Sequence, residues 1–136
     1  MIHFSAIVQD RYRSNKLLIV EHSPTQLVRL LGLLGGVQGL GMLLTAKSLE
    51  QAFTTLQTEK PALVILDLHM PDGNALQSVK RMKRLAPGVQ VAALTFEPSP
   101  FDRAWCLVAG ADFVLDKASE FEELAAIAMR AASGSQ

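Results

Sequence analysis

The chain has 136 residues, of which 49% are hydrophobic and 19% charged, a balance that suits one globular domain and excludes a disordered or collagen-like protein. Lys and Arg together number 13, as do Asp and Glu, so no basic excess exists to attract nucleic acid, and we expect no nucleic-acid partner. The lone Cys106 excludes an internal disulfide. No apolar stretch approaches the ~20 residues that cross a bilayer, and the N-terminal segment lacks the apolar core of a signal peptide. We therefore expect a cytoplasmic protein that does not bind membranes.

The pattern divides the chain into three segments. Residues 1–15 follow neither the helical nor the strand period, and we expect an N-terminal arm there, which could form a short helix packed on the domain or on a second copy. Residues 16–131 alternate regularly between strand and helix patterns and are predicted to form one domain. Residues 132–136 are expected to be a flexible tail.

Five short apolar runs predict strands, namely residues 17–20, 42–45, 62–66, 91–94 and 113–115. The first, third and fourth runs are continuously apolar, which is typical of strands that are covered on both faces of a parallel sheet. A helical pattern follows each strand. Strands alternating with helices predict an α/β protein with a doubly wound (βα)₅, flavodoxin-like fold and a parallel sheet in the order 2-1-3-4-5.

Capping residues mark the expected helix starts. Ser residues open four of the five helical patterns, at Ser23, Ser48, Ser99 and Ser119, and the third pattern follows Gly73. The fourth helix carries an apolar stripe of Phe101, Ala104, Trp105 and Val108. From this stripe we expect Trp105 to lie in the core and Cys106 at the surface.

Polar residues stand where four of the strands end. Glu21 and His22 follow the first strand, Asp67 follows the third, Thr95 the fourth and Lys117 the fifth. The carboxyl ends of parallel strands meet at one edge, and ligands bind there at the point where the strand order reverses, between strands 1 and 3. These side chains are therefore predicted to share one crevice.

The four segments that carry these residues read LLIVEHS, VILDLHMPDG, VAALT and GADFVLDK. In this order the chain resembles the receiver domain of bacterial response regulators over residues 16–131. The resemblance implies a phosphoprotein of two-component phosphorelay signalling rather than an enzyme.

The resemblance also implies roles for three residues. Asp67 would be the phosphoacceptor, because a carboxylate can take a phosphoryl group as an acyl phosphate. Lys117 would pair with Asp67 and then with a phosphoryl oxygen. Thr95 would offer its hydroxyl to the phosphoryl group and move the following loop and helix with it.

A divalent cation, normally Mg²⁺, is implied as the cofactor, because phosphoryl transfer to a carboxylate brings negative charges together. Its expected ligands are Glu21, Asp67, the backbone carbonyl of His69 and His22, whose imidazole suits a hard cation less well than an oxygen does. Family members have a second acid where this chain has His22, so we expect Mg²⁺ to bind weakly here.

His22 has three interpretations. It marks a position that has drifted because strong Mg²⁺ binding is no longer needed, which is the reading we favour. Alternatively, with His69, Asp67 and Glu21, it suits Mn²⁺ or Zn²⁺ better than Mg²⁺. In the third reading, a protonated His22 supplies part of the missing positive charge beside Asp67.

Phe96 is a second departure, because receivers commonly have a small residue directly after the threonine. Its ring is expected either to narrow the path to Asp67 or to pack against Phe101.

The implied partners are a sensor histidine kinase or phosphotransfer protein, which supplies the phosphoryl group, and a downstream output protein. The signal would leave through the face made by the fourth helix, fifth strand and fifth helix, which is also a possible homodimer surface. We expect a stand-alone receiver, since the chain ends shortly after the fifth helix.

Other functions remain open. An atypical receiver could act as a phosphorylation-independent docking module. A phosphatase of the haloacid dehalogenase type would need a second acid at position 69, where the residue is His69. Flavin or nucleotide binding is disfavoured because the loop of residues 21–24 lacks a glycine-rich phosphate cradle.

Overall fold

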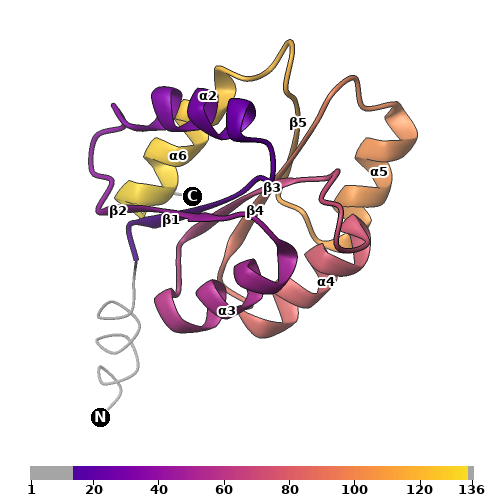
Figure 1. Ribbon diagram of the computed structural model, residues 1–136, viewed down its shortest axis with the longest axis horizontal. Coiled ribbons are helices and arrows are strands. Elements are labelled where there is room, and N and C mark those ends of the chain that lie inside the picture. Colours follow the sequence, from indigo (N-terminus) through magenta and orange to yellow (C-terminus); the bar gives the residue numbers. More distant parts are fainter. Residues whose placement is uncertain (1–13, 135–136) are drawn as a thin grey trace.

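Strands and helices alternate through residues 14–134, the part of the chain that this computed structural model describes (Figure 1). The expected arm falls on residues that lie almost wholly outside this range, as do the last two residues of the expected tail. The elements are β1 (Lys16–Val20), α2 (Pro24–Leu34), β2 (Met42–Ala46), α3 (Leu49–Glu59), β3 (Leu63–Asp67), α4 (Ala75–Leu85), β4 (Gln90–Thr95), α5 (Pro100–Ala109), β5 (Phe113–Asp116) and α6 (Glu123–Ser133).

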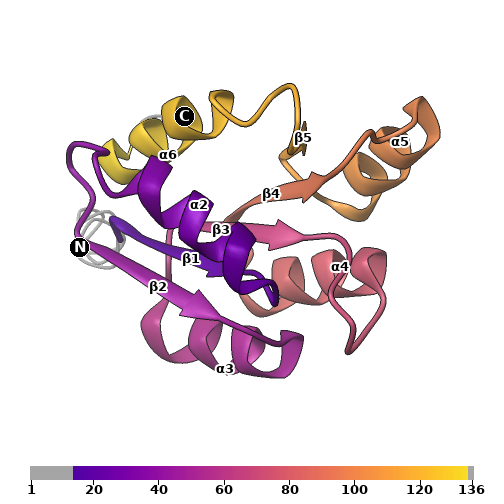
Figure 2. The same cartoon turned by 45° about the horizontal axis from the view of Figure 1, so that its top comes forward.

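The strands form one parallel sheet in the order β2-β1-β3-β4-β5, which confirms the predicted fold. Helices α2 and α6 cover one face, and α3, α4 and α5 cover the other (Figures 1 and 2). The central strand β3 is buried along its whole length, as its continuous apolar run predicts. The order reverses at β1 and β3, so the carboxyl ends of these two strands are where the site is expected.

Successive residues of each central strand pack into different cores. Leu18 and Val64 point to the side of α3, α4 and α5, whereas Leu17 and Ile65 point to the side of α2 and α6. All four side chains are fully buried, and each contributes about 1.5–3 kcal/mol to folding by leaving water. The sheet is thus held from both faces, and its carboxyl edge becomes a rigid base for the polar residues.

Side-chain caps fix the helix starts at three of the four predicted serines. Ser23, Ser48 and Ser99 each accept a hydrogen bond from the amide three residues later, at 3.3, 3.1 and 3.0 Å. The fourth expectation is wrong: α6 begins at Glu123, and Ser119 does not cap it. Instead, Glu120 accepts a hydrogen bond from the amide of Asp116, which closes a turn where the helix was expected.

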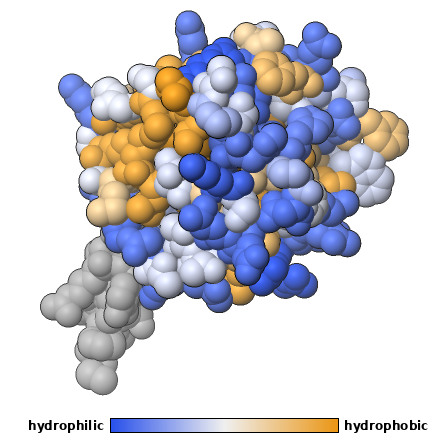
Figure 3. Space-filling view, in the orientation of Figure 1, coloured by the Kyte–Doolittle hydropathy of each residue, from blue (hydrophilic) through white to orange (hydrophobic). Residues whose placement is uncertain are grey.

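The orientation of α5 also differs from the prediction. Trp105 is 52% exposed, whereas Cys106 is 3% exposed and packs in the core with Ala109. The stripe that contains Trp105 and the stripe that contains Cys106 both follow the helical period. The prediction assumed that the stripe with the larger side chains would be the buried one. Small residues face the core because α5 packs closely on α4 and β5. Phe101, Val108 and Trp105 are left at the surface, and Figure 3 shows apolar side chains on this side of the molecule.

No helix within residues 14–134 is long and apolar enough to span a bilayer.

The loop after β3 is tied to α3 by one carboxylate. Asp72 accepts hydrogen bonds from the amides of Leu49 at 2.9 Å and Glu50 at 3.4 Å. These amides lie at the start of α3 and have no acceptor within the helix. We expect Asp72→Ala to lower the free energy of unfolding by about 1–2 kcal/mol, because it removes both a cap and a favourable charge at the helix N-terminus. Urea unfolding measures this change. Asp72→Asn keeps an acceptor and should lose less, so equal losses in the two variants would contradict the capping role.

Candidate functional site

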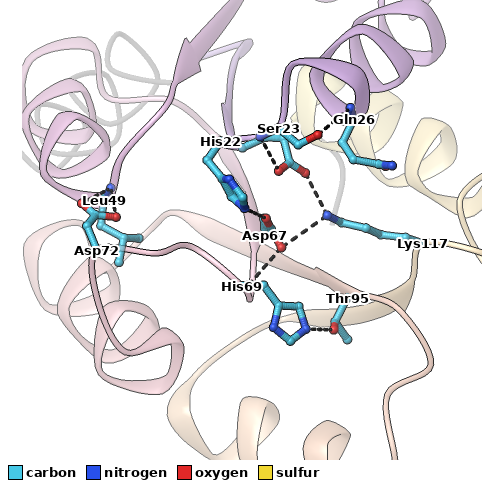
Figure 4. A network of polar contacts seen from close by, with 10 residues as sticks. His22, Ser23, Gln26, Leu49, Asp67, His69, Asp72, Thr95 and Lys117 are labelled. Atoms are coloured by element: carbon cyan, nitrogen blue, oxygen red, sulfur yellow. Dashed lines mark hydrogen bonds and ion pairs between the residues drawn. The ribbon is translucent and has the colours of Figure 1, made fainter.

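Four polar side chains lie at the carboxyl ends of four strands, as predicted, and Figure 4 labels three of them, Asp67, Thr95 and Lys117. Glu21 directly follows β1, Asp67 and Thr95 are the last residues of β3 and β4, and Lys117 directly follows β5. Each is at most 5% exposed. Polar groups that are buried to this degree need partners, and within residues 14–134 no buried side-chain nitrogen or oxygen lacks a hydrogen bond.

Lys117 joins the two acids of the crevice. Its Nζ lies 2.8 Å from Oε1 of Glu21 and 3.3 Å from Oδ1 of Asp67. The sequence predicted the contact with Asp67 but not the shorter one with Glu21. The ammonium therefore divides its charge between two buried carboxylates, and a group that binds Asp67 must compete for it.

Asp67 is held as a carboxylate. Burial raises the pKa of Asp67, but the hydrogen bond from the His69 amide at 3.0 Å and the charge of Lys117 outweigh burial and hold this pKa below its usual range. The group is therefore ionised throughout the neutral pH range. An ionised carboxylate is the form that binds a cation or attacks phosphorus.

Glu21, His22 and Asp67 form the one cluster of possible metal ligands among the described residues. Their ligand atoms lie within 4.8 Å of one another, and Nε2 of His22 is 3.6 Å from Oδ2 of Asp67. The spacing fits a divalent cation, which would neutralise charge in the crevice. One of the three donors is an imidazole, which suits Mn²⁺ or Zn²⁺ better than Mg²⁺.

Both oxygens of Glu21 already have protein partners. Oε1 contacts Lys117, and Oε2 accepts a hydrogen bond from the amide of Ser23 at 3.2 Å. A metal that binds Glu21 must share it with these donors. Oδ1 of Asp67 is likewise occupied by the His69 amide and Lys117. Nε2 of His22 and Oδ2 of Asp67 are therefore the more available ligand atoms.

Thr95 is contacted by a residue from the turn that follows the neighbouring strand β3. Its hydroxyl lies 2.7 Å from Nε2 of His69, and the two side chains point toward each other in Figure 4. From the sequence, His69 was assigned a role only as a metal ligand, through its backbone carbonyl or as a member of the alternative Mn²⁺ or Zn²⁺ set, so this contact of its ring was missed. Among the described residues, the ring of His69 is not part of the cluster of possible metal ligands. Strand pairing offered a signal, because Asp67 pairs with Leu94, and His69 and Thr95 stand just beyond this pair.

Phe96 lies at the mouth of the site. Its side chain is 48% exposed, and its ring centroid is 5.4 Å from Nζ of Lys117. The alternative of inward packing against Phe101 is wrong, because Phe101 is itself 71% exposed and its ring contacts Trp105. Phe96 is therefore positioned to cover part of the approach to Lys117.

The comparisons with known proteins agree with this arrangement. Residues 17–129 match the family model of the response regulator receiver domain. The chain is 33% identical over 91 residues to the KDP operon transcriptional regulatory protein KdpE of Escherichia coli, a match that covers 66% of this chain and 40% of KdpE. It is 28% identical over 110 residues to the response regulator GacA of Pseudomonas syringae, covering 80% of this chain and 51% of GacA.

The chain thus spans about half or less of these relatives. Among solved structures, a two-component response regulator from Clostridium difficile has a TM-score of 0.75 at 22% identity, over 88% of this chain and 95% of that one, and it supports the fold. With the family model covering most of the chain and the strand-end residues gathered in one crevice, the chain belongs to the response regulator receiver domain family of two-component systems.

Proposed function

We propose that this receiver accepts a phosphoryl group on Asp67 from a phosphohistidine of a sensor histidine kinase or phosphotransfer protein. A carboxylate oxygen of Asp67 forms a bond to phosphorus while the phosphorus–nitrogen bond of the donor breaks, and the leaving imidazole takes up a proton. The observation that carries the proposal is the buried, ionised carboxylate of Asp67 with the ammonium of Lys117 3.3 Å away at the strand-order reversal.

Two side chains would receive the transferred group. Lys117 would pair with a phosphoryl oxygen as a compact positive charge, since it already lies beside Oδ1 of Asp67. Thr95 would donate its hydroxyl to another oxygen. A cation held by Asp67, His22, Glu21 and the carbonyl of His69 would neutralise the remaining charge, with Mn²⁺ favoured over Mg²⁺ by the imidazole.

The output surface is proposed to be the face of α5, β5 and α6, which corresponds to the fourth helix, fifth strand and fifth helix of the fold. On α5 three large apolar side chains, Phe101, Trp105 and Val108, are more than half exposed. Exposed apolar patches of this kind mark protein interaction sites. A downstream output protein or a second copy of the chain would bind there.

A docking module that never takes phosphate is the second candidate. The observation that favours it is the imidazole of His22 in place of a second acid, together with the pairing of Glu21 with Lys117 at 2.8 Å. Both features lower the number of free oxygen ligands for a metal. Phosphodonor labelling distinguishes the two candidates.

Asp67 is predicted to be the site of phosphorylation. Incubation with a small phosphodonor such as acetyl phosphate, with Mg²⁺ or Mn²⁺, should add one phosphoryl group per chain, measured by intact mass. Asp67→Asn should take up none, because an amide is not a nucleophile for this step. A wild-type protein that stays unlabelled with both metals, or a variant that labels equally, would favour the docking module.

The metal preference is predicted to depend on His22. His22→Asp should tighten Mg²⁺ binding by at least about tenfold, because it replaces an imidazole by a hard oxygen ligand. Calorimetry of both proteins with Mg²⁺ and Mn²⁺ measures this, and Mn²⁺ should gain much less. Tight Mg²⁺ binding by the wild type, with no gain in the variant, would show that His22 lies outside the coordination sphere.

Phe96 is predicted to slow access to Asp67. Phe96→Ala should raise both the labelling rate and the hydrolysis rate of the acyl phosphate, because both reactions need an in-line path to phosphorus. The free energy of unfolding of Phe96→Ala should fall by less than about 1 kcal/mol, since the ring of Phe96 is half exposed. Phe96→Leu is the matched control that keeps apolar bulk and should change the rates less. Unchanged rates in Phe96→Ala would remove the gating role.

A further inference from the structure

We propose that the imidazole of His69 is a positioning residue that holds the Thr95 hydroxyl away from Asp67 until a phosphoryl group arrives. The inference rests on the proposed function, in which Thr95 donates to that group. It assigns to the side chain of His69 a role separate from metal ligation by its carbonyl.

The geometry of the contact carries the inference. Nε2 of His69 lies 2.7 Å from Oγ1 of Thr95, at the short end of the normal range for a hydrogen bond. Thr95 is 5% exposed, so water has little access to its hydroxyl. Within residues 14–134 the Thr95 hydroxyl makes its hydrogen bond to His69. No hydrogen bond in this range joins this hydroxyl to the side chain of Asp67 or Lys117.

The bond competes with the step proposed for Thr95. A hydroxyl has one proton, and if that proton points at Nε2 it is not available to a phosphoryl oxygen. If Nε2 carries the proton instead, the hydroxyl oxygen accepts from the ring and its own proton stays free, but the bond still holds the oxygen beside His69. In either tautomer, movement of the Thr95 hydroxyl toward a phosphoryl group on Asp67 would break this bond, and the free energy of the lost bond would oppose the movement.

His69 also contacts the phosphoacceptor. Its backbone amide donates to Oδ1 of Asp67 at 3.0 Å, so one residue binds the carboxylate with its main chain and the hydroxyl with its ring. Thr95 is in turn the last residue of β4, four residues before the Ser99 cap of α5. A movement of Thr95 away from His69 would therefore shift the short loop that leads into α5, the helix that bears the exposed apolar side chains.

The test uses beryllofluoride, which binds a carboxylate with the geometry of a phosphoryl group, at a saturating concentration of Mn²⁺ or Mg²⁺. Calorimetric titration gives its affinity for the wild type and for three variants of His69. His69→Ala and His69→Asn should bind it about three- to tenfold more tightly, because the unliganded state loses one net hydrogen bond. His69→Gln should stay near the wild type, because the amide of Gln reaches the position of Nε2 and that of Asn does not.

The background variant Thr95→Val distinguishes this role from a general effect of position 69. In that background, His69→Ala should leave the beryllofluoride affinity unchanged, because no hydroxyl remains to be released. An affinity that is unchanged or weaker in His69→Ala alone, or a gain that persists in the Thr95→Val background, would overturn the proposal.

A measurement without any phosphoryl analogue keeps the two proposals separate. Urea unfolding of the wild type, His69→Ala, Thr95→Val and the double variant gives the coupling between the two side chains. We expect the unfolding equilibrium constant to show about three- to tenfold coupling. If beryllofluoride binds none of the proteins, phosphorylation of Asp67 fails as a proposal while this cycle still decides whether His69 holds Thr95. Coupling of less than about twofold would overturn the contact itself.

Discussion

The site depends on one ammonium group that lies between two carboxylates. Glu21 and Asp67 come from neighbouring strands and are both removed from water, so without a cation between them each would repel the other in a medium that screens charge poorly. Lys117 enters from the far side of β4 and contacts both acids. Breaking a buried ion pair of this kind typically costs about 3–5 kcal/mol, because the remaining charge stays buried without a partner. Lys117 thus stabilises the sheet edge as well as the carboxylate of Asp67.

The same three groups explain why a further positive charge is needed. Two carboxylates face one ammonium before any ligand binds. In the proposed reaction a phosphoryl group carrying about −1.5 to −2 would replace the single charge of Asp67, so the negative charge would grow by about −0.5 to −1. Lys117 cannot balance this total alone. In the proposed reaction the balance would come from a divalent cation, from a positive charge on His22, or from both. His22 stands where the receiver family has a second acid. Its imidazole could bind a cation when neutral or carry a positive charge when protonated, but it cannot do both at once.

The fold could be read from the sequence because its signals agree with one another. Continuous apolar runs identified the central strands, and serine caps fixed three helix starts within a residue. The shared crevice followed from the parallel order. Orientation on α5 could not be predicted, because Trp105 and Cys106 both lie on helical stripes and only the packed helix shows which stripe is covered. The ring of His69 was missed because a side-chain contact across strands depends on a rotamer that no sequence pattern specifies.

The exposed position of Trp105 gives this protein a built-in optical probe. It is the sole tryptophan of the chain, and it lies half in solvent on α5 against the ring of Phe101. Indole emission shifts with the polarity of its surroundings, so any partner that covers α5 alters the fluorescence without an attached label. Selective excitation of one residue therefore reports on the surface that the receiver would present to its output, while the buried core stays spectroscopically silent.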